Sequence, residues 1–492
     1  MNDCILLHPT DNVAVALHDL QAGQQITLPD GRTLTLHNAI TFGHKVAVRS
    51  IAQGEKVLKY GLPIGSATRA IAAGEHVHVQ NLNLEQTKER RLKPLLTPQT
   101  LPMTGYLRND GRKGIRNVIV VTYLVECAHH VAEQIAQQTD SREMPVHLIG
   151  FGGCAPNAYA QLVMEQLCTH PNVGGVVIVS LGCENFLRDQ LLDRVKQSGR
   201  PGALVVIQEE GGTISSIRKG VEAMKAMTPA VQVVRKVELH WEDLCIGAVC
   251  GGSDACSGIT ANPAVGCTFD RLVDAGATCI FEEPGELIGC ETMLLERGAT
   301  KEVGLQLYDC IHKADVYYKK MGHDSFSQGN AEGGLTTIEE KSLGSYSKSG
   351  SRTIIGLIRP GEIPTANGLY MMDVVPDGEA RWGFPNVSDT AEIVEMMASG
   401  CHLVLYTTGR GSVAGSAIAP VIKVCSNPIT YQHLSEDMDI NAGRIISEGA
   451  TLEEISDELL HLIGQVADGQ MTKSEVQGHR EFFLGYKEFC RK

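Results

Sequence analysis

The first 85 residues alternate apolar and polar positions with the period of a β-strand. Segments such as "NVAVALHDL", "HKVAVRSI" and "EHVHVQNL" follow one another closely, and turn residues that include Gly31, Gly54 and Gly74 separate them. A period of two places successive side chains on opposite faces of a strand. Many short strands joined by tight turns predict a small β-rich, barrel-like domain over residues 1–85.

The pattern changes after residues 86–103, a polar and then proline-rich stretch that predicts a linker. From residue 104 onward, apolar runs such as "NVIVVTYL" and "VGGVVIVSLGC" are each followed by a segment with helical periodicity. Apolar strands that alternate with helices are typical of a parallel sheet covered on both faces. Four such units predict an α/β domain over residues 104–235.

Residues 236–492 repeat this alternation, with strands expected at "CIGAVC", "TCIFEE" and "HLVLYTTGRG". Near the end, "TLEEISDELLHLIGQVADG" predicts an amphipathic helix whose capping box pairs Thr451 with Glu454. The expected fold class is therefore α/β. A small β-rich domain precedes two parallel-sheet α/β regions, and we expect the last of these to be the catalytic domain.

Composition narrows the classes of function. The chain of 492 residues has a net charge of −14 and no dense Lys/Arg run, so it lacks the basic footprint that nucleic acids require. No stretch of 18 apolar residues and no signal-peptide pattern occur, so we expect neither a membrane span nor secretion. Fifteen cysteines then favour reduced thiols in the cytoplasm. The expected partner is a small molecule, and the oligomeric state stays open, a homo-oligomer included.

Three cysteines close apolar strands beside glycine: Cys154 in "IGFGGC", Cys183 in "VSLGC" and Cys250 in "IGAVC". Ligands of open parallel sheets bind at the carboxyl ends of the strands. Three thiolates with one open coordination position are able to hold a catalytic metal or an iron–sulfur cluster. No CxxC spacing supports this reading, and the alternative is that the cysteines are small buried residues where a strand meets a helix.

Histidines and arginines supply further candidates. His76 and His78 share one face of a strand, as a chelating pair would, and a solvent-facing strand is the alternative. His44 and Lys45 follow a glycine in a turn. Arg112 and Arg116 in "GYLRNDGRKGIRN", and Arg410 in "TTGRG", are suited to gripping a carboxylate, while a solvated charged turn is the alternative.

The motifs "HPTDNVAVAL", "GYLRNDGRKGIRN", "SLGCEN", "CGGSDACSGITANPAVG", "GGLTTIEEKSLG" and "TTGRG", in this order, resemble the altronate and galactarate dehydratases over nearly the whole chain. The resemblance implies an N-terminal domain of the SAF type and a main body of two further regions. It implies the removal of water from a sugar acid to give a 2-keto-3-deoxy acid, with iron as the cofactor. The departures "TTGRGSVAG" and "SQGN" leave altronate, galactarate or a related 2,3-dihydroxy acid as the expected substrate.

The resemblance also implies roles for individual residues. Cys154, Cys183 and Cys250 fall on three motifs of the family, and we expect them to hold Fe²⁺ or a three-cysteine cluster. The expected acid–base and catalytic residues are His44, Lys45 and Asp254. The expected substrate-binding residues are Arg112, Arg116, Ser253, Thr260, Asn262 and Arg410. The alternatives are a lyase of the sulfolactate sulfo-lyase type, which the family also contains, and a non-catalytic sugar-acid-binding protein.

Overall fold

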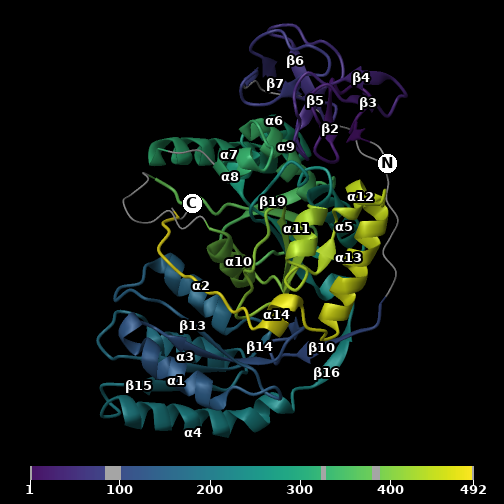
Figure 1. The fold of residues 1–492 in the computed structure, drawn as a ribbon. Coiled ribbons are helices and arrows are strands. Elements are labelled where there is room, and N and C mark those ends of the chain that lie inside the picture. Colours follow the sequence, from purple (N-terminus) through teal and green to yellow (C-terminus); the bar gives the residue numbers. More distant parts are fainter. Residues whose placement is uncertain (1–2, 84–100, 323–327, 379–387, 490–492) are drawn as a thin grey trace.

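The computed structural model describes residues 3–83, 101–322, 328–378 and 388–489, so residues 86–100 of the predicted linker lie outside the described residues. Three parts follow one another in space (Figure 1). The N-terminal domain (purple) lies at one end, the second domain (blue) at the other, and the C-terminal domain (green and yellow) between them. The predicted α/β class is confirmed: a strand-rich first domain precedes parallel sheets covered by helices.

Short antiparallel strands build the N-terminal domain, as the alternating pattern predicts. They are β1 (Cys4–Ile5), β2 (Val13–Ala16), β3 (Gln25–Thr27), β4 (Thr33–Thr35), β5 (Lys45–Ala47), β6 (Lys56–Lys59), β7 (Leu62–Ala67), β8 (His76–Val77) and β9 (Leu82–Asn83). They form sheets of order β1-β2-β5-β8, β3-β4 and β6-β7-β9. Gly31, Gly54 and Gly74 have φ angles of 85°, 79° and 86° in the connecting turns, a conformation that glycine adopts without strain.

The second domain is a four-stranded parallel sheet of order β13-β12-β14-β15. Its strands are β12 (Val118–Tyr123), β13 (Val146–Gly150), β14 (Val173–Ser180) and β15 (Gly202–Val206), and its helices are α1 (His129–Thr139), α2 (Ala158–Cys168), α3 (Arg188–Gln197) and α4 (Thr213–Gln232). Every residue of β14 is buried, which explains its unbroken apolar run. Helices α1 and α4 pack on one face, and α2 and α3 pack on the other.

A small antiparallel sheet, which the sequence pattern did not predict, links the second domain to the rest. It consists of β10 (Met103–Leu107), β11 (Lys113–Gly114) and β16 (Lys236–Leu239) in the order β11-β10-β16. Strand β10 precedes the second domain and β16 follows it, and the two pair from Met103 with Leu239 to Tyr106 with Lys236. The chain therefore enters and leaves the second domain through paired strands.

The C-terminal domain is built on a seven-stranded parallel sheet of order β19-β20-β18-β17-β21-β22-β23. The strands are β17 (Cys245–Cys250), β18 (Thr278–Phe281), β19 (Ile354–Ile358), β20 (Leu369–Met372), β21 (Leu403–Thr408), β22 (Val421–Cys425) and β23 (Ile440–Asn441). The helices are α5 (Ala261–Asp274), α6 (Glu291–Arg297), α7 (Lys301–Met321), α8 (Gln328–Glu332), α9 (Ile338–Lys348), α10 (Asp389–Ala398), α11 (Pro428–His433), α12 (Arg444–Ser447), α13 (Leu452–Ala467) and α14 (Lys473–Gln477). Thr451 and Glu454 form the predicted capping box of α13.

Apolar packing joins the two parallel sheets into one body. A single core cluster contains Val120 of β12, Val163 of α2, Met396 of α10 and Tyr406 of β21, so α2, α3 and α10 fill the space between the sheets. Helices α5 and α13 cover the opposite face of the large sheet. In the described part of the chain, no helix has both the length and the apolar character that a membrane span requires.

Candidate active site

The loop between β17 and α5 lies at the carboxyl end of the seven-stranded sheet and begins at Cys250. The buried Cys250 amide donates to Glu283 Oε1 at 3.0 Å, and the Cys250 thiol lies 3.0 Å from Ser253 Oγ. Glu283 follows the neighbouring strand β18 and has a φ angle of 76°. A non-glycine residue held in this conformation is uncommon, and such residues gather at functional sites.

A cavity of about 250 Å³ opens beside this loop. Its walls come from the start of the loop, from the acidic turn after β18, from Tyr318 of α7, from Lys341 of α9 and from Asp389 and Glu392 of α10. Small volume and a lining rich in charged groups suit a small polar ligand rather than a large apolar one. The start of the loop after β17 therefore forms one wall of a small polar cavity.

A larger cavity of about 1160 Å³ lies near α2, α7 and the C-terminal segment. Its charged side chains are occupied with one another: Lys313 contacts Asp373 at 2.6 Å and Asp377 at 3.0 Å, and Arg359 contacts Asp377 at 2.9 Å. These groups form an ion-pair network among themselves. We therefore place the candidate site at the smaller cavity, where the β17 and β18 strand ends meet.

Two lysines of α9 bring positive charge to the small cavity. Lys348 ion-pairs with Glu283, and Lys341 Nζ lies 2.8 Å from Glu286 Oε1. Burial disfavours the charged lysines, but the facing carboxylates outweigh it and raise the pKa of both. Burial and the neighbouring Glu286 raise the pKa of the Cys250 thiol to about 12. Lys341 belongs to the cavity lining, whereas Lys348 acts on the cavity only through Glu283, which lines it. The cavity therefore presents one ammonium group and a neutral thiol, and the ammonium group is able to stabilise an oxyanion.

Carboxyl groups outnumber cations behind this cavity. Glu395 ion-pairs with Lys487 at 2.7 Å, but neither carboxylate oxygen of the buried Glu282 accepts a hydrogen bond. Ligand oxygens of Glu282, Glu283 and Glu392 lie within 4.8 Å of one another. Burial and neighbouring carboxylates raise the pKa of Glu282 well above its usual value and that of Glu392 to about 7. A divalent cation with oxygen ligands would displace the protons of these carboxyl groups and compensate the resulting charges, so this donor set fits a metal.

Asp254, Thr260 and Asn262 are anchored within the protein. Asp254 accepts hydrogen bonds from Asn427 Nδ2 at 2.9 Å and from Ser426 Oγ at 3.1 Å, and from backbone amides of its own loop. Thr260 Oγ1 donates to the Ser426 carbonyl at 2.8 Å, and Asn262 Nδ2 donates to a carbonyl of α9 at 3.2 Å. These contacts position the loop, and direct roles in catalysis or substrate binding stay predictions for all three.

His44 and Lys45 lie where the N-terminal domain meets the C-terminal domain. The fully buried Lys45 ammonium binds both carboxylate oxygens of Glu340 on α9, at 3.0 and 2.9 Å. Burial lowers the pKa of Lys45 to about 8, although Glu340 opposes this shift. His44 lies beside Gly334, and its Nδ1 is 3.0 Å from His76 Nε2. Burial and neighbouring cationic groups lower the pKa of His44 to about 4, so the ring is neutral at pH 7.

The three predicted cysteine ligands belong to two different sheets. Cys154 and Cys183 follow β13 and β14 of the second domain, where the Asn185 amide donates to the Cys154 carbonyl at 2.8 Å, and both cysteines are exposed. Cys250 ends β17 of the large sheet and is buried. Across the described ranges, the groups with ligand atoms within 4.8 Å are Cys250–Glu283–Glu286 and Glu282–Glu283–Glu392. The structure thus brings Cys250 together with carboxylates and leaves Cys154 and Cys183 outside both groups.

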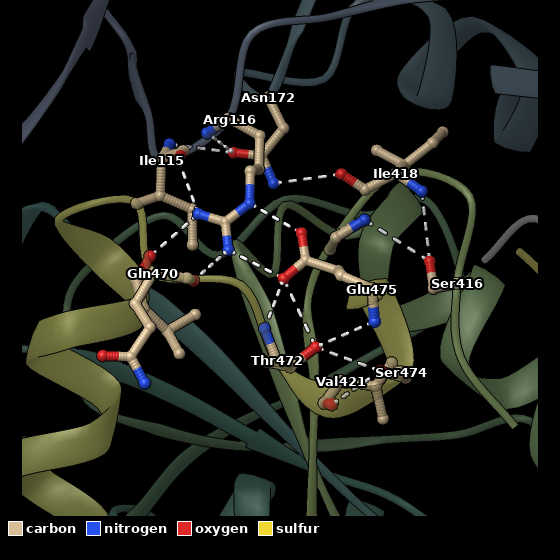
Figure 2. A network of polar contacts seen from close by, with 12 residues as sticks. Ile115, Arg116, Asn172, Ser416, Ile418, Val421, Gln470, Thr472, Ser474 and Glu475 are labelled. Atoms are coloured by element: carbon tan, nitrogen blue, oxygen red, sulfur yellow. Dashed lines mark hydrogen bonds and ion pairs between the residues drawn. The ribbon is translucent and has the colours of Figure 1, made fainter. Parts of the chain in front are cut away.

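The predicted arginines are divided between the two ends of the sheet. Arg116 grips Glu475 with bonds of 2.7 and 2.8 Å and donates to the Gln470 carbonyl, as Figure 2 shows. It also donates to the Val466 carbonyl at 2.8 Å. Arg112 ion-pairs with Asp110 at 2.7 Å.

The turn that carries Arg112 and Arg116 contacts the amino end of β17, because His402 bridges the Lys113 carbonyl and the Cys245 amide. Strand β17 runs from Cys245 to Cys250 and spans roughly 17 Å, so Arg112 and Arg116 lie about that far from Cys250. Arg410, by contrast, lies beside the loop, and its amide donates to the Gly252 carbonyl at 2.9 Å. The structure therefore groups Arg410 with the site, whereas Arg112 and Arg116 lie at the opposite end of the strand.

Models of one known protein family match all three domains of the chain. The model "D-galactarate/Altronate dehydratase, C-terminal" matches residues 241–489, and models of the family's SAF and second domains match residues 2–85 and 105–232. The chain is 30% identical to the altronate dehydratase of Bacillus subtilis (strain 168), over 98% of this chain and 99% of the relative. It is 33% identical to the galactarate dehydratase (L-threo-forming) of Escherichia coli (strain K12), over 95% and 93%.

The chain belongs to the D-galactarate/altronate dehydratase family. It is accordingly a hydro-lyase, as the sequence resemblance implied. The family also extends to proteins split into two subunits. The β subunit of the (2R)-sulfolactate sulfo-lyase of Chromohalobacter salexigens is 32% identical over 77% of this chain, and the α subunit is 36% identical over 16% of it.

Sequence reasoning missed the charged groups in and beside the small cavity: Glu282, Glu283, Glu286, Lys341 and Lys348. A signal was present, because the predicted strand "TCIFEE" ends in two carboxylates at the same sheet edge as Cys250. The lysines were harder to find. They lie on α9, and only the tertiary packing of this helix over the strand ends brings them to the cavity.

Proposed function

We propose that this hydro-lyase dehydrates a sugar acid with hydroxyls at C2 and C3, in a metal-dependent reaction at the small cavity beside Cys250. The observation that supports it best is the charge pattern at the cavity: Lys341 lines the opening, Lys348 pairs with Glu283, and the carboxyl groups of Glu282, Glu283 and Glu392 lie close together beside them. The relatives named for altronate and galactarate have similar identities, so the proposal extends to the sugar-acid class rather than to one stereoisomer.

The chemistry accounts for the residue types. Removal of the C2 proton of a hydroxy acid produces an enediolate with two negative charges. Departure of the C3 hydroxyl as water then leaves an enol, which tautomerises to the 2-keto-3-deoxy acid. Lys341 would hold the substrate carboxylate or the developing oxyanion, since it lines the cavity and its raised pKa keeps it charged. Lys348 would hold Glu283 in place.

Glu282, Glu283 and Glu392 would hold the metal ion, for which we propose Fe²⁺. Their oxygens are suited to a hard or borderline divalent cation, and Glu282 has no protein donor to compensate it. The ion would supply Lewis-acid stabilisation of negative charge. Cys250 would contribute through Glu283, because the Cys250 amide donates a hydrogen bond to the Glu283 carboxylate at 3.0 Å and holds it in place.

The test is a substrate screen on anaerobically purified, Fe²⁺-loaded protein. Altronate, galactarate and their stereoisomers are offered, and the 2-keto acid is measured as its semicarbazone. We expect turnover of at least one sugar acid, and Lys341→Met is expected to lower kcat/KM by at least about a hundredfold. Lys319→Met, at an exposed lysine of α7, is the matched control. If (2R)-sulfolactate released sulfite while every sugar acid stayed intact, the dehydratase assignment would be wrong.

A further inference from the structure

The N-terminal domain gathers three imidazole rings on one face, beside the β17–α5 loop. We propose that His44, His76 and His78 form a binding site for a divalent transition-metal ion. This site is separate from the carboxylate cluster behind Cys250. It therefore stands or falls independently of the proposed dehydratase reaction.

Strand pairing brings the three histidines together. Strands β5 and β8 are antiparallel, with Lys45 opposite Val77 and Val46 opposite His76. The same register, continued by one pair, places His44 opposite His78. Side chains of directly opposed residues share a face, and His76 and His78 share that face because they are two positions apart. Lys45 lies on the other face, where it ion-pairs with Glu340.

The separation of the rings matches a three-histidine metal centre. Their centroids lie 5.1 Å (His44–His76), 4.8 Å (His44–His78) and 5.4 Å (His76–His78) apart. A metal–nitrogen distance of about 2.1 Å and ligand angles of about 90–110° place coordinating imidazole centroids about 4.6–5.3 Å apart. The three rings are not among the groups of described residues whose ligand atoms already lie within 4.8 Å of one another, so coordination requires the rings to turn and direct one nitrogen each toward a common centre.

The protein leaves ring nitrogens available for an ion. His44 Nδ1 and His76 Nε2 lie 3.0 Å apart and bond only through a shared proton, which a metal would replace. The buried Nδ1 of His78 has no hydrogen-bond partner. Imidazole nitrogens prefer ions such as Zn²⁺, Fe²⁺, Co²⁺ and Ni²⁺ to Mg²⁺ or Ca²⁺. Three protein ligands also leave a position open for water or a small anionic ligand.

The His44 ring packs closely against Gly334 of the C-terminal domain. Gly334 has a φ angle of 93°, and a Cβ there would lie 3.0 Å from His44 Cδ2 and 3.1 Å from Ala255 Cβ. Gly334 thus places the His44 ring near Ala255, which belongs to the loop that begins at Cys250. An ion at this position would tie the small domain to the catalytic loop, and His44 would then bind a metal instead of transferring the proton predicted for it.

The experiment measures Co²⁺ binding to the full-length chain after treatment with a chelator. We expect visible d–d absorption bands in the wild type, and a loss of affinity of at least about tenfold in His76→Ala and in His78→Ala. His37→Ala, at an exposed histidine of the same domain, should bind as the wild type does. Glu282→Gln should leave these bands unchanged, which separates the two sites. Unchanged Co²⁺ binding in the His44→Ala/His76→Ala/His78→Ala variant would overturn the proposal.

A second measurement needs no variant. Zn²⁺ is added to the wild-type protein before modification by diethylpyrocarbonate, and modified histidines are located by mass spectrometry. We expect protection of His44, His76 and His78 and unchanged modification of His18 and His37, which are exposed. Equal modification of all five histidines with and without Zn²⁺ would exclude the site even if the alanine variants fail to fold.

Discussion

Lys45 and Lys59 of the N-terminal domain share one carboxylate, that of Glu340 on α9. The two ammonium groups lie 2.9 and 2.8 Å from its oxygens, and all three side chains are fully buried. Burial opposes the ionisation of Glu340, but the two lysines and Thr336 outweigh it and hold its pKa well below the usual value. The small domain is thus attached by a buried ionic contact as well as by apolar packing.

We predict that Glu340→Gln lowers the free energy of unfolding by about 3–5 kcal/mol, because it leaves two buried ammonium groups without their counter-ion. Chemical denaturation at pH 7 measures this loss. Glu55→Gln removes an exposed partner of Arg49 in the same domain and should cost less than about 1 kcal/mol. Equal losses in the two variants would contradict the structural role of Glu340.

Arg116→Ala should destabilise the protein by about 2–4 kcal/mol and leave the KM for substrate unchanged. The reason is that Arg116 clamps Glu475 and the end of α13, at the amino end of β17 (Figure 2). Thermal unfolding and steady-state kinetics below the unfolding temperature measure the two quantities. A raised KM with unchanged stability would restore the substrate-binding role predicted from the sequence.

The iron content of variants distinguishes the carboxylate cluster from the three-cysteine ligand set predicted from the sequence. Glu282→Gln is expected to lower the iron content at the carboxylate cluster, and to stabilise the metal-free protein by about 1–3 kcal/mol by removing an uncompensated buried acid. Cys183→Ser, at an exposed position of the second domain, should retain the iron. Elemental analysis after anaerobic purification measures both. Loss of iron in Cys183→Ser would support the three-cysteine prediction.

His147 on β13 predicts a pH dependence. Burial and the nearby Arg480 lower its pKa to about 4 from an ordinary value of 6.5. Between these values the unfolded chain binds a proton that the folded chain does not, so stability falls as the pH drops from about 6.5 to about 4. In His147→Gln, the loss of unfolding free energy between pH 7 and pH 5 should be smaller by up to about 2 kcal/mol. An identical pH dependence in the wild type and the variant would exclude this contribution.

Much of this architecture could be predicted from periodicity, because unbroken apolar strands such as β14 and alternating strands such as β3 differ plainly in sequence. The strand-end rule placed the loop after Cys250 at the carboxyl edge of a parallel sheet, where the structure has it. The same rule could have placed Arg116 at the far edge, since Arg116 precedes a strand instead of following one.

Other features of the site depend on pairing and packing that a single sequence does not reveal. The predicted domain bounds already separated Cys154 from Cys250, but only the structure shows that the two belong to different sheets and do not come together. The position of His44 opposite His78 needs the register of β5 and β8, and the approach of Lys341 to the cavity needs the packing of α9.

The pairing of β10 with β16 has a consequence for how this chain tolerates change. Its two strands bring Met103 and Leu239 side by side, although more than a hundred residues of the second domain lie between them. Insertions or deletions within those residues leave both ends of the connection where they are, so the register of the seven-stranded sheet does not depend on their length. The second domain can therefore diverge in size and surface as an inserted module, while the catalytic cavity keeps its geometry.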